Sequence, residues 1–216
     1  MKSLSPYRQR GISLLESLIA MLVTALGILG ILGMQMRTLT DSQASVRRTQ
    51  AIRLIEDLGE RMTAHPNALG SMGSYVIGWT SGVTPASAVN CGSTNCTGAQ
   101  LAAYDIAEWK RTVQRTMPQG DANVFIAPAD AGSVNNQRQL GVMISWRENE
   151  RDTTANYRDR IDATKVTGSG GSLYDGAGSA ATCPSGRICH LQYLAVPARC
   201  APYTLAGSTQ YFCPGA

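Results

Sequence analysis

Glu16 is a lone carboxylate inside an apolar stretch, and its distance from Gly11 gives it a possible chemical use. The stretch runs from Ile12 to Met36 and has no other charge. A carboxylate at the centre of a membrane helix costs about 2.5–3.5 kcal/mol, and less near an end, so it normally has a partner. A cut after Gly11 would create an amine on Ile12, one helical turn before Glu16. We therefore expect Glu16 to complement the helix dipole and to pair with the N-terminal amine of a neighbouring subunit. The alternative is a carboxylate that only reaches the membrane interface.

The residues before the stretch predict its topology. A secretory signal places its small-residue cleavage site after the apolar run, whereas Gly11 precedes it here, so the mature protein would keep the helix. The leader MKSLSPYRQR carries Lys2, Arg8 and Arg10. Cytoplasmic flanks are enriched in such charges. We expect a cytoplasmic N-terminus, a single span long enough to cross the hydrocarbon, and the rest of the chain on the far side.

The charge balance argues against a nucleic-acid partner. Nineteen Lys and Arg face fifteen Asp and Glu, a formal net charge of +4, and the three leader charges account for most of it. Proteins whose binding depends on phosphate neutralisation carry a basic patch or stripe. Charged residues make up 16% of the chain, which excludes a self-repelling disordered chain.

Catalytic and metal-binding patterns are poor, so we expect neither an enzyme nor a cofactor. The usual nucleophile, zinc and phosphate-loop motifs are missing, and the glycines at 168–171 lack a following lysine. His190 falls within a strand pattern and is expected to be a packed or edge histidine. Asp105 and Glu108, one helical turn apart, are expected on a solvated face. With His65 and His190 as the only imidazoles and no CxxC, a metal site is not expected.

The cysteines indicate export. Their number is even and all of them follow residue 90, as expected for disulfides formed in an oxidising compartment. They are Cys91, Cys96, Cys183, Cys189, Cys200 and Cys213. The preferred pairing is Cys91–Cys96, Cys183–Cys189 and Cys200–Cys213. Nested pairs, Cys183–Cys213 and Cys189–Cys200, are a serious alternative.

A helix is predicted to continue beyond the apolar stretch into water. Residues 37–64 keep a helical period of apolar positions between charges, and Pro66 stops it, because the residue before proline avoids the α region. A helix over 12–64 would be about 80 Å long. The apolar positions expected to face a globular domain are Leu39, Val46, Ile52, Ile55, Leu58 and Met62.

The rest of the chain, residues 65–216, is expected to form a small α+β head. Apolar spacing predicts an amphipathic helix near 99–117, and strands are expected at 122–128, 139–148 and 187–197. Alternation in the second strand predicts that one face is buried and one is not. Trp109 and Trp146 are expected in the core, and Trp79 is the tryptophan expected to be most exposed. The predicted architecture is a long N-terminal helix packed on a small antiparallel sheet, with one extra helix and disulfide-braced loops.

The segment Arg10-Gly-Ile-Ser-Leu-Leu-Glu-Ser-Leu18 resembles the class III signal of type IV prepilins. The resemblance implies cleavage between Gly11 and Ile12 by prepilin peptidase, N-methylation of Ile12, and a role for Glu16 in the registration of subunits in the fibre. Major pilins usually have Phe where this chain has Ile12, and commonly a kinking Pro farther along. Here Gly27, Gly30 and Gly33 interrupt the run instead, either to permit local melting or close packing, or as ordinary membrane-helix composition.

The head extends the resemblance. Cys91…Cys96-Thr-Gly-Ala-Gln-Leu-Ala-Ala-Tyr-Asp-Ile-Ala-Glu-Trp109, followed by Pro118-Gln-Gly120, is similar to minor pilins of the PilV kind, the type IV pilus modification proteins. The signal and these stretches imply four parts: a cleaved leader (1–11), a membrane and fibre-core helix (12–36), an amphipathic periplasmic helix (37–64) and a pilin head (65–216). The region 148–186 matches no known pattern.

Together the residues and the resemblance predict a minor pilin that primes or assembles type IV pili. It would lie in the bacterial inner membrane with a periplasmic head before joining the fibre with other minor pilins and the major pilin. Alternatives are a pseudopilin of a type II secretion system, or a fibre-tip adhesin or DNA receptor. The receptor would use the loops near 75–98 and 168–186, or Lys110, Arg111 and Arg115, which are more often the ordinary polar face of a helix.

Overall fold

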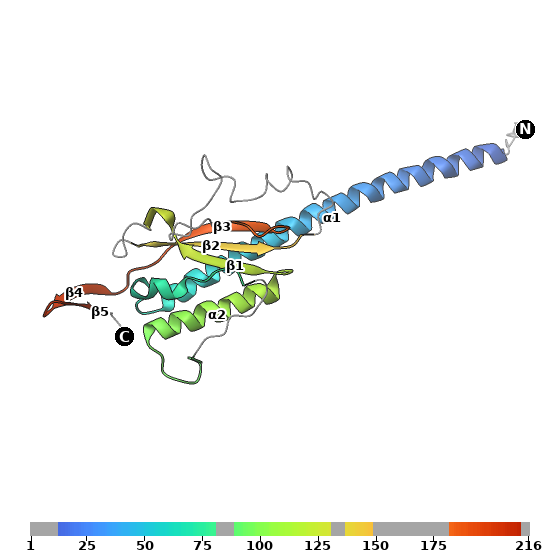
Figure 1. Ribbon diagram of the computed structural model, residues 1–216. Helices are drawn as coiled ribbons and strands as arrows, with labels where there is room; N and C mark the ends of the chain where they lie inside the picture. The colour runs from blue at the N-terminus through green and yellow to red at the C-terminus, as the bar shows by residue number, and fades with distance from the viewer. Residues whose placement is uncertain (1–12, 81–88, 131–136, 149–181, 213–216) are drawn as a thin grey trace, which may run out of the picture. The chain divides into compact units, whose positions relative to one another are not determined.

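The computed structural model describes residues 13–80, 89–130, 137–148 and 182–212. The chain divides into two compact units, Met1–Gln43 and Ala44–Ala216. One helix, α1 (Leu14–Ala64), contributes to both units (Figure 1). It ends at Ala64, as predicted, immediately before His65 and Pro66.

The second unit holds the predicted antiparallel sheet. Its strands are β1 (Asp121–Ile126), β2 (Gln139–Trp146) and β3 (Ile188–Ala195), in the order β1-β2-β3, and both pairings are antiparallel. The long N-terminal helix, the small sheet and one extra helix confirm the predicted α+β, type IV pilin-like fold. Short 3₁₀ helices flank this framework, η1 (Leu69–Tyr75) and η2 (Pro128–Asp130). The first of them was not among the predicted elements.

The extra helix, α2 (Gly98–Thr116), starts and stops at recognisable signals. Thr97 caps it: its hydroxyl accepts from Gln100 N, and the Gln100 side chain accepts from Thr97 N at 2.9 Å, which completes a capping box. After α2 the chain turns sharply through Gln119, whose φ is 50°. A Cβ on Gly120 would lie 2.6 Å from Val113 O, so only glycine fits this turn.

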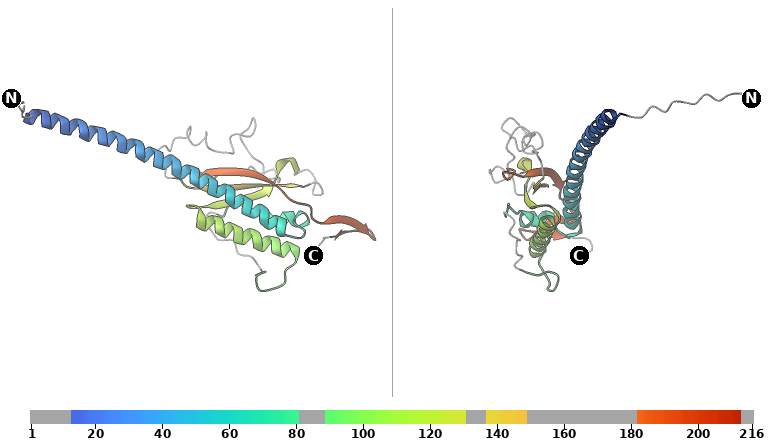
Figure 2. Two further views of the ribbon diagram at one scale, coloured as in Figure 1. Left: turned by 180° about the vertical axis from the view of Figure 1, so that it is seen from behind. Right: turned by 90° about the vertical axis from the view of Figure 1, so that its right-hand side faces the viewer.

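Helix α2 and the C-terminal part of α1 cover one face of the sheet, and their side chains share its core (Figure 2). Their direction is antiparallel, because the His65 ring contacts Gly98 O at 2.9 Å while Trp109 Nε1 donates to Leu54 O at 2.6 Å. A buried indole N–H needs such a partner. This hydrogen bond therefore ties α2 to α1 in the middle of the core.

Fewer of the predicted apolar positions of α1 are buried in the core between helices and sheet than we expected. Ile55, Leu58 and Met62 are buried, whereas Leu39 and Val46 are 59% and 53% exposed. Packing on α1 begins near Ala51, whose small side chain allows close approach and which sequence reasoning did not include. The remaining large core side chains are Leu54, Tyr75, Ile106, Trp109, Val113, Leu140, Val142, Ile144 and Trp146.

The prediction that β2 is half-buried is wrong. Both faces of this strand are buried from Leu140 to Trp146. On the face away from the helices, Phe125, Met143 and Cys189 form a second cluster that includes the half-buried Trp79. A Cβ on Gly141 would lie 2.4 Å from Phe125 Cε2, so Gly141 leaves room for the ring. The alternation of residues in β2 predicted one exposed face. That face is buried because β2 is the central strand of the sheet.

A separate two-stranded ladder, β4 (Ala201–Leu205) and β5 (Ser208–Phe212), was missed by sequence analysis. Ala206 and Gly207 form its turn with φ values of 51° and 81°. Two successive positive φ values are typical of the tight type I′ hairpin turn. In place of the usual Asn-Gly this turn has Ala-Gly, and so the strongest hairpin signal was missing.

Candidate functional site

The N-terminal segment is the first candidate site, and its helix begins at a side-chain cap. Gly11 and Ile12, the predicted cleavage and methylation residues, lie outside the described residues. Ser13 Oγ accepts a hydrogen bond from Glu16 N at 3.2 Å, and Ser17 N donates to Ser13 O. Ser13 thus acts as the N-cap that the spacing Ser-x-x-Glu favours, a signal that sequence reasoning missed.

Glu16 lies in the first turn of α1, where a carboxylate complements the positive end of the helix dipole. Its side chain is exposed, and within the described residues it forms no ion pair. The carboxylate is therefore free to meet a cation outside its own subunit. The structure leaves the predicted amine pairing open, because that pairing is between subunits.

From Ser17 to Met36 helix α1 carries no charged residue, and its large apolar side chains are exposed. An 18-residue window within α1 has a mean hydropathy of 2.3, and α1 is long and apolar enough to cross a membrane. Thr24 Oγ1 donates to Ala20 O at 2.7 Å, so its hydroxyl is satisfied within the helix, as an apolar environment requires. At Gly27, Gly30 and Gly33 an added Cβ would meet nothing within 4 Å. The large exposed side chains are Leu14, Leu15, Leu18, Ile19, Met21, Leu22, Val23, Leu26, Ile28, Leu29, Ile31, Leu32, Met34 and Met36.

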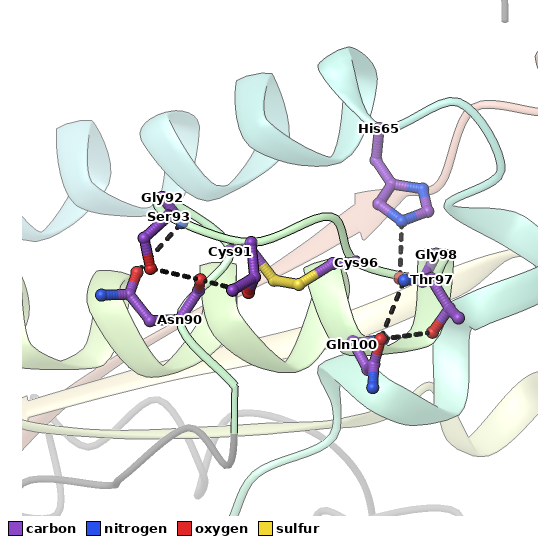
Figure 3. The surroundings of a disulfide bond; sticks show 10 residues. His65, Asn90, Cys91, Gly92, Ser93, Cys96, Thr97, Gly98 and Gln100 are labelled. Atoms are coloured by element: carbon purple, nitrogen blue, oxygen red, sulfur yellow. Dashed lines mark hydrogen bonds between the residues drawn. A yellow bond between two sulfur atoms is a disulfide. The ribbon is translucent and has the colours of Figure 1, made fainter.

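The Cys91–Cys96 disulfide and His65 fix the start of α2 (Figure 3). The two cysteines are bonded, with Cα atoms 5.6 Å apart, and Asn90 closes the loop through hydrogen bonds from Gly92 N, Ser93 and Thr94. His65 accepts from Asn67 N through Nδ1, so its Nε2 carries the proton and donates to Gly98 O. The ring therefore links the C-terminal end of α1 to the first residue of α2.

The other cysteines brace the opposite part of the head. Cys183 is bonded to Cys189, with Cα atoms 5.9 Å apart, beside the second cluster. Cys200 is also disulfide-bonded, while Cys213 lies outside the described residues. The pairing of Cys200 with Cys213 stays a prediction.

Lys110 is the largest departure from the sequence analysis. It was grouped with Arg111 and Arg115 as a polar helix face, but its side chain is completely buried. Its Nζ forms an ion pair with Asp121 Oδ1 at 2.9 Å and donates to Ala122 O at 2.6 Å and to Gly78 O. Arg111 instead pairs with Glu108. The three residues therefore do not form a basic stripe. The predicted DNA-binding surface on α2 is not supported.

The surroundings of Asp121 favour its ionised form. Burial alone would raise the pKa of Asp121, but the hydrogen bond and charge of Lys110, with the N–H groups of Thr80 and Ala122, outweigh it and lower the pKa. Burial lowers the pKa of Lys110, and Asp121 opposes this shift. The pair joins α2 to β1 and to the segment at 78–80. It is therefore part of the structural framework.

The remaining titratable candidates do not form a catalytic site. His190 is half-buried on β3, and burial, followed by the charge of Arg48, lowers its pKa. Asp105 is half-buried, with its pKa raised by burial against the charges of Arg61 and His65, so it is not on the fully solvated face that we expected. Among the described residues no group of His, Cys, Asp and Glu side chains could hold a metal ion.

A long helix with an apolar first half, a carboxylate in its first turn and a disulfide-braced α+β head fit a type IV pilin-like fold. Comparison with known families agrees. The family model for the prokaryotic N-terminal methylation motif matches residues 6–32, and that of the Tt1218-like type IV pilins matches residues 33–107. These two matches support a type IV pilin. No curated protein and no solved structure matched it.

These matches bear on the other predictions made from the leader. The methylation motif implies processing by prepilin peptidase and assembly with other pilins, and with the apolar helix it supports membrane anchoring and a link to the pilus. A pilin is a structural subunit, which is consistent with a protein that is not an enzyme.

Proposed function

We propose that this chain is a minor pilin that is stored in the inner membrane through α1 and joins other minor pilins to prime fibre assembly. The observation that carries the proposal is the apolar surface of α1 before residue 37, together with the lone Glu16. Water cannot solvate such a surface favourably, so it must be covered first by lipid and then by the helices of neighbouring subunits.

Cleavage after Gly11 supplies the second half of the mechanism. It removes the leader charges Lys2, Arg8 and Arg10 and creates the amine of Ile12, which methylation leaves as a cation. An incoming subunit then buries its carboxylate only where a cation of its neighbour meets it, because an unpaired charge in an apolar core is costly. Glu16 would thereby select the register in which helices stack. Two departures from major pilins, Ile12 and the absence of proline from the apolar run, favour a minor subunit.

The leader assignment is tested by Gly11→Ala in cells that make the pilus. Intact mass should show a product that keeps the 11 leader residues, whereas the wild-type chain loses them and carries one added methyl group. Normal maturation of the variant would refute the cleavage site. Ser13→Ala is the matched control, because it changes a nearby residue and should leave cleavage intact.

The role of Glu16 is tested by Glu16→Gln, which keeps the shape and removes the charge. We expect normal processing and membrane level but a large loss of surface fibres, counted by electron microscopy. Asp41→Asn is the control, since Asp41 lies on the same helix beyond the apolar stretch. Wild-type fibre numbers with Glu16→Gln would count against charge registration. Mass spectrometry of sheared fibres tests the minor role, which would be excluded if this chain were the main component.

A further inference from the structure

Four arginines lie together at the end of the head where α1 enters the unit Ala44–Ala216. They are Arg47 and Arg48 of α1, Arg147 directly after β2, and Arg187 directly before β3, and we call them the arginine cluster. Arg47 Nη1 donates to Arg147 O at 3.2 Å. The register sets Trp146 against Ile188, so Arg147 and Arg187 are neighbours at the same end of the sheet (Figure 1).

The arginine cluster concentrates positive charge on one end of the head. All four side chains are exposed or half-buried, and no ion pair among the described residues includes any of them. The acid that follows Arg147, Glu148, accepts from Trp146 Nε1 at 3.2 Å. Burial lowers the pKa of His190 on β3, and the charge of Arg48 lowers it further. Cations that are grouped in this way attract an anionic partner.

The connection to the apolar helix favours the phosphates of a bilayer as that partner. Only residues 37–43 separate the apolar stretch from this unit, and as part of α1 the chain from Met36 to Arg47 rises about 16 Å at 1.5 Å per residue. The headgroup layer on one side of a bilayer takes up roughly 5–7 Å of this rise. The remaining gap, roughly 9–11 Å, is comparable with the Debye length of about 10 Å at 0.1 M salt.

Two further effects shorten this gap. The long side chain of an arginine extends its charge away from the helix axis. Membrane helices are also tilted by about 20° on average, which lowers one side of the head toward the headgroups. A nucleic acid is the competing polyanion, but binding to it would not require the arginine cluster to lie at the end of the head that continues into the apolar helix.

We propose that the arginine cluster docks the head onto anionic phospholipid headgroups of the membrane that holds α1. This inference rests on the proposed function, since it requires storage of the subunit in a bilayer. Each arginine close to an anionic surface adds attraction. The stored subunit is therefore held by its head as well as by its apolar helix, and the head contact is broken when the subunit leaves for the fibre.

The test uses the full chain in lipid nanodiscs, with the photo-crosslinking residue benzoylphenylalanine at Thr116. Thr116 is exposed at the end of α2, and Arg147 N donates to Pro118 O just beyond it. Ala99 is the matched control site, because it is exposed at the opposite end of the same helix. In discs that contain phosphatidylglycerol, mass spectrometry should find about tenfold more lipid adduct from Thr116 than from Ala99.

The charge dependence of the adduct separates docking from chance contact. Discs of phosphatidylcholine alone, or about 0.5 M salt, should reduce the Thr116 adduct to the level of Ala99. Arg48→Gln with Arg147→Gln should reduce it about tenfold. Arg138→Gln with Arg199→Gln is the matched control, because it removes the same charge from exposed positions at the other end of the sheet, and it should leave the adduct unchanged.

Equal adduct in both kinds of disc, equal adduct from Thr116 and Ala99, or adduct from neither site would overturn the docking proposal. Salt-dependent binding of a DNA duplex through the same arginines, without lipid adduct, would assign the arginine cluster to nucleic acid and also overturn it. A chain that docks on anionic discs but is absent from fibres and minor-pilin complexes in cells would refute the proposed function alone. Failure of α1 to insert would refute both.

Discussion

The buried ion pair between Lys110 and Asp121 should be the most sensitive polar contact in the head. Both side chains are at most 1% exposed, whereas the other two ion pairs among the described residues are partly in solvent. Lys110→Met keeps most of the side-chain volume and removes the cation. It leaves the Asp121 carboxylate buried without its counterion, and Gly78 O and Ala122 O without their donor.

The size of the effect follows from these contacts. Removal of one partner of a buried pair costs about 3–5 kcal/mol. Asp121 would still accept from Thr80 N at 2.9 Å, from Thr80 Oγ1 and from Ala122 N, so we expect the lower end, about 3 kcal/mol. For a unit of this size that corresponds to a fall in Tm of roughly 6–12 °C.

The assay is urea unfolding of the unit Ala44–Ala216 with its disulfides intact, followed by tryptophan fluorescence. Arg115→Met is the matched control, because Arg115 lies on the same helix and is exposed, and it should change the free energy of unfolding by about 0.5 kcal/mol or less. If Lys110→Met were as mild as Arg115→Met, the pair would contribute nothing and the reasoning would fail. The double variant with Asp121→Asn should recover part of the loss, because it also removes the buried negative charge.

The pH dependence of the two proteins should differ in sign. The folded pKa of Asp121 is lowered, so its contribution to wild-type stability is present above the unfolded value of about 3.9 and is lost as the pH falls through the folded pKa. In Lys110→Met, burial without a cation raises the pKa of Asp121, and protonation then relieves the buried charge. The gap in free energy of unfolding should therefore shrink below about pH 4.

Two further predictions concern the packing of the sheet and the loop before α2. Gly141→Ala should destabilise the head by about 1–3 kcal/mol in urea unfolding, because its Cβ would overlap the buried Phe125 ring. Gly73→Ala is the control, because a Cβ added there meets nothing within 4 Å. Equal effects of the two substitutions would contradict the steric reason. Cys91→Ser with Cys96→Ser should lower the free energy of unfolding by about 2 kcal/mol, because the loop is freed. Thr97→Ala should lower it by about 1 kcal/mol, because the helix cap is lost. Thermal unfolding measures both, and an unchanged Tm for both variants would show that neither feature fixes the start of α2.

Sequence patterns located the elements well because their signals are local. Helix α1 ends at Ala64 since Pro66 follows, and α2 was predicted at 99–117 against an observed Gly98–Thr116. The hairpin β4–β5 was missed because its turn residues, Ala206 and Gly207, lack the usual signal and its strands face no core. The burial of β2 was wrong because alternation reports the side chains of one strand and not what covers its second face.

The same limit explains Lys110. Its spacing on α2 is that of an ordinary solvated residue, and nothing near it in the sequence names Asp121 as a partner. Its burial depends on the approach of Gly78 and of β1, both distant along the chain. Leu39 and Val46 show the converse: both are apolar positions in the right period, and both are exposed.

The sequence by itself determined the features that depend on neighbours along the chain: the apolar helix, the carboxylate five residues after Gly11, the helix boundaries and the even set of cysteines. These are set by local period, sterics and charge, which read directly from residue order. The tertiary structure decided which side chains the core encloses, that Lys110 is buried beside Asp121, and that Tyr203, Leu205 and Phe212 stay exposed on the hairpin. Those outcomes depend on segments brought together across the chain, where desolvation and packing, not spacing, determine the free energy.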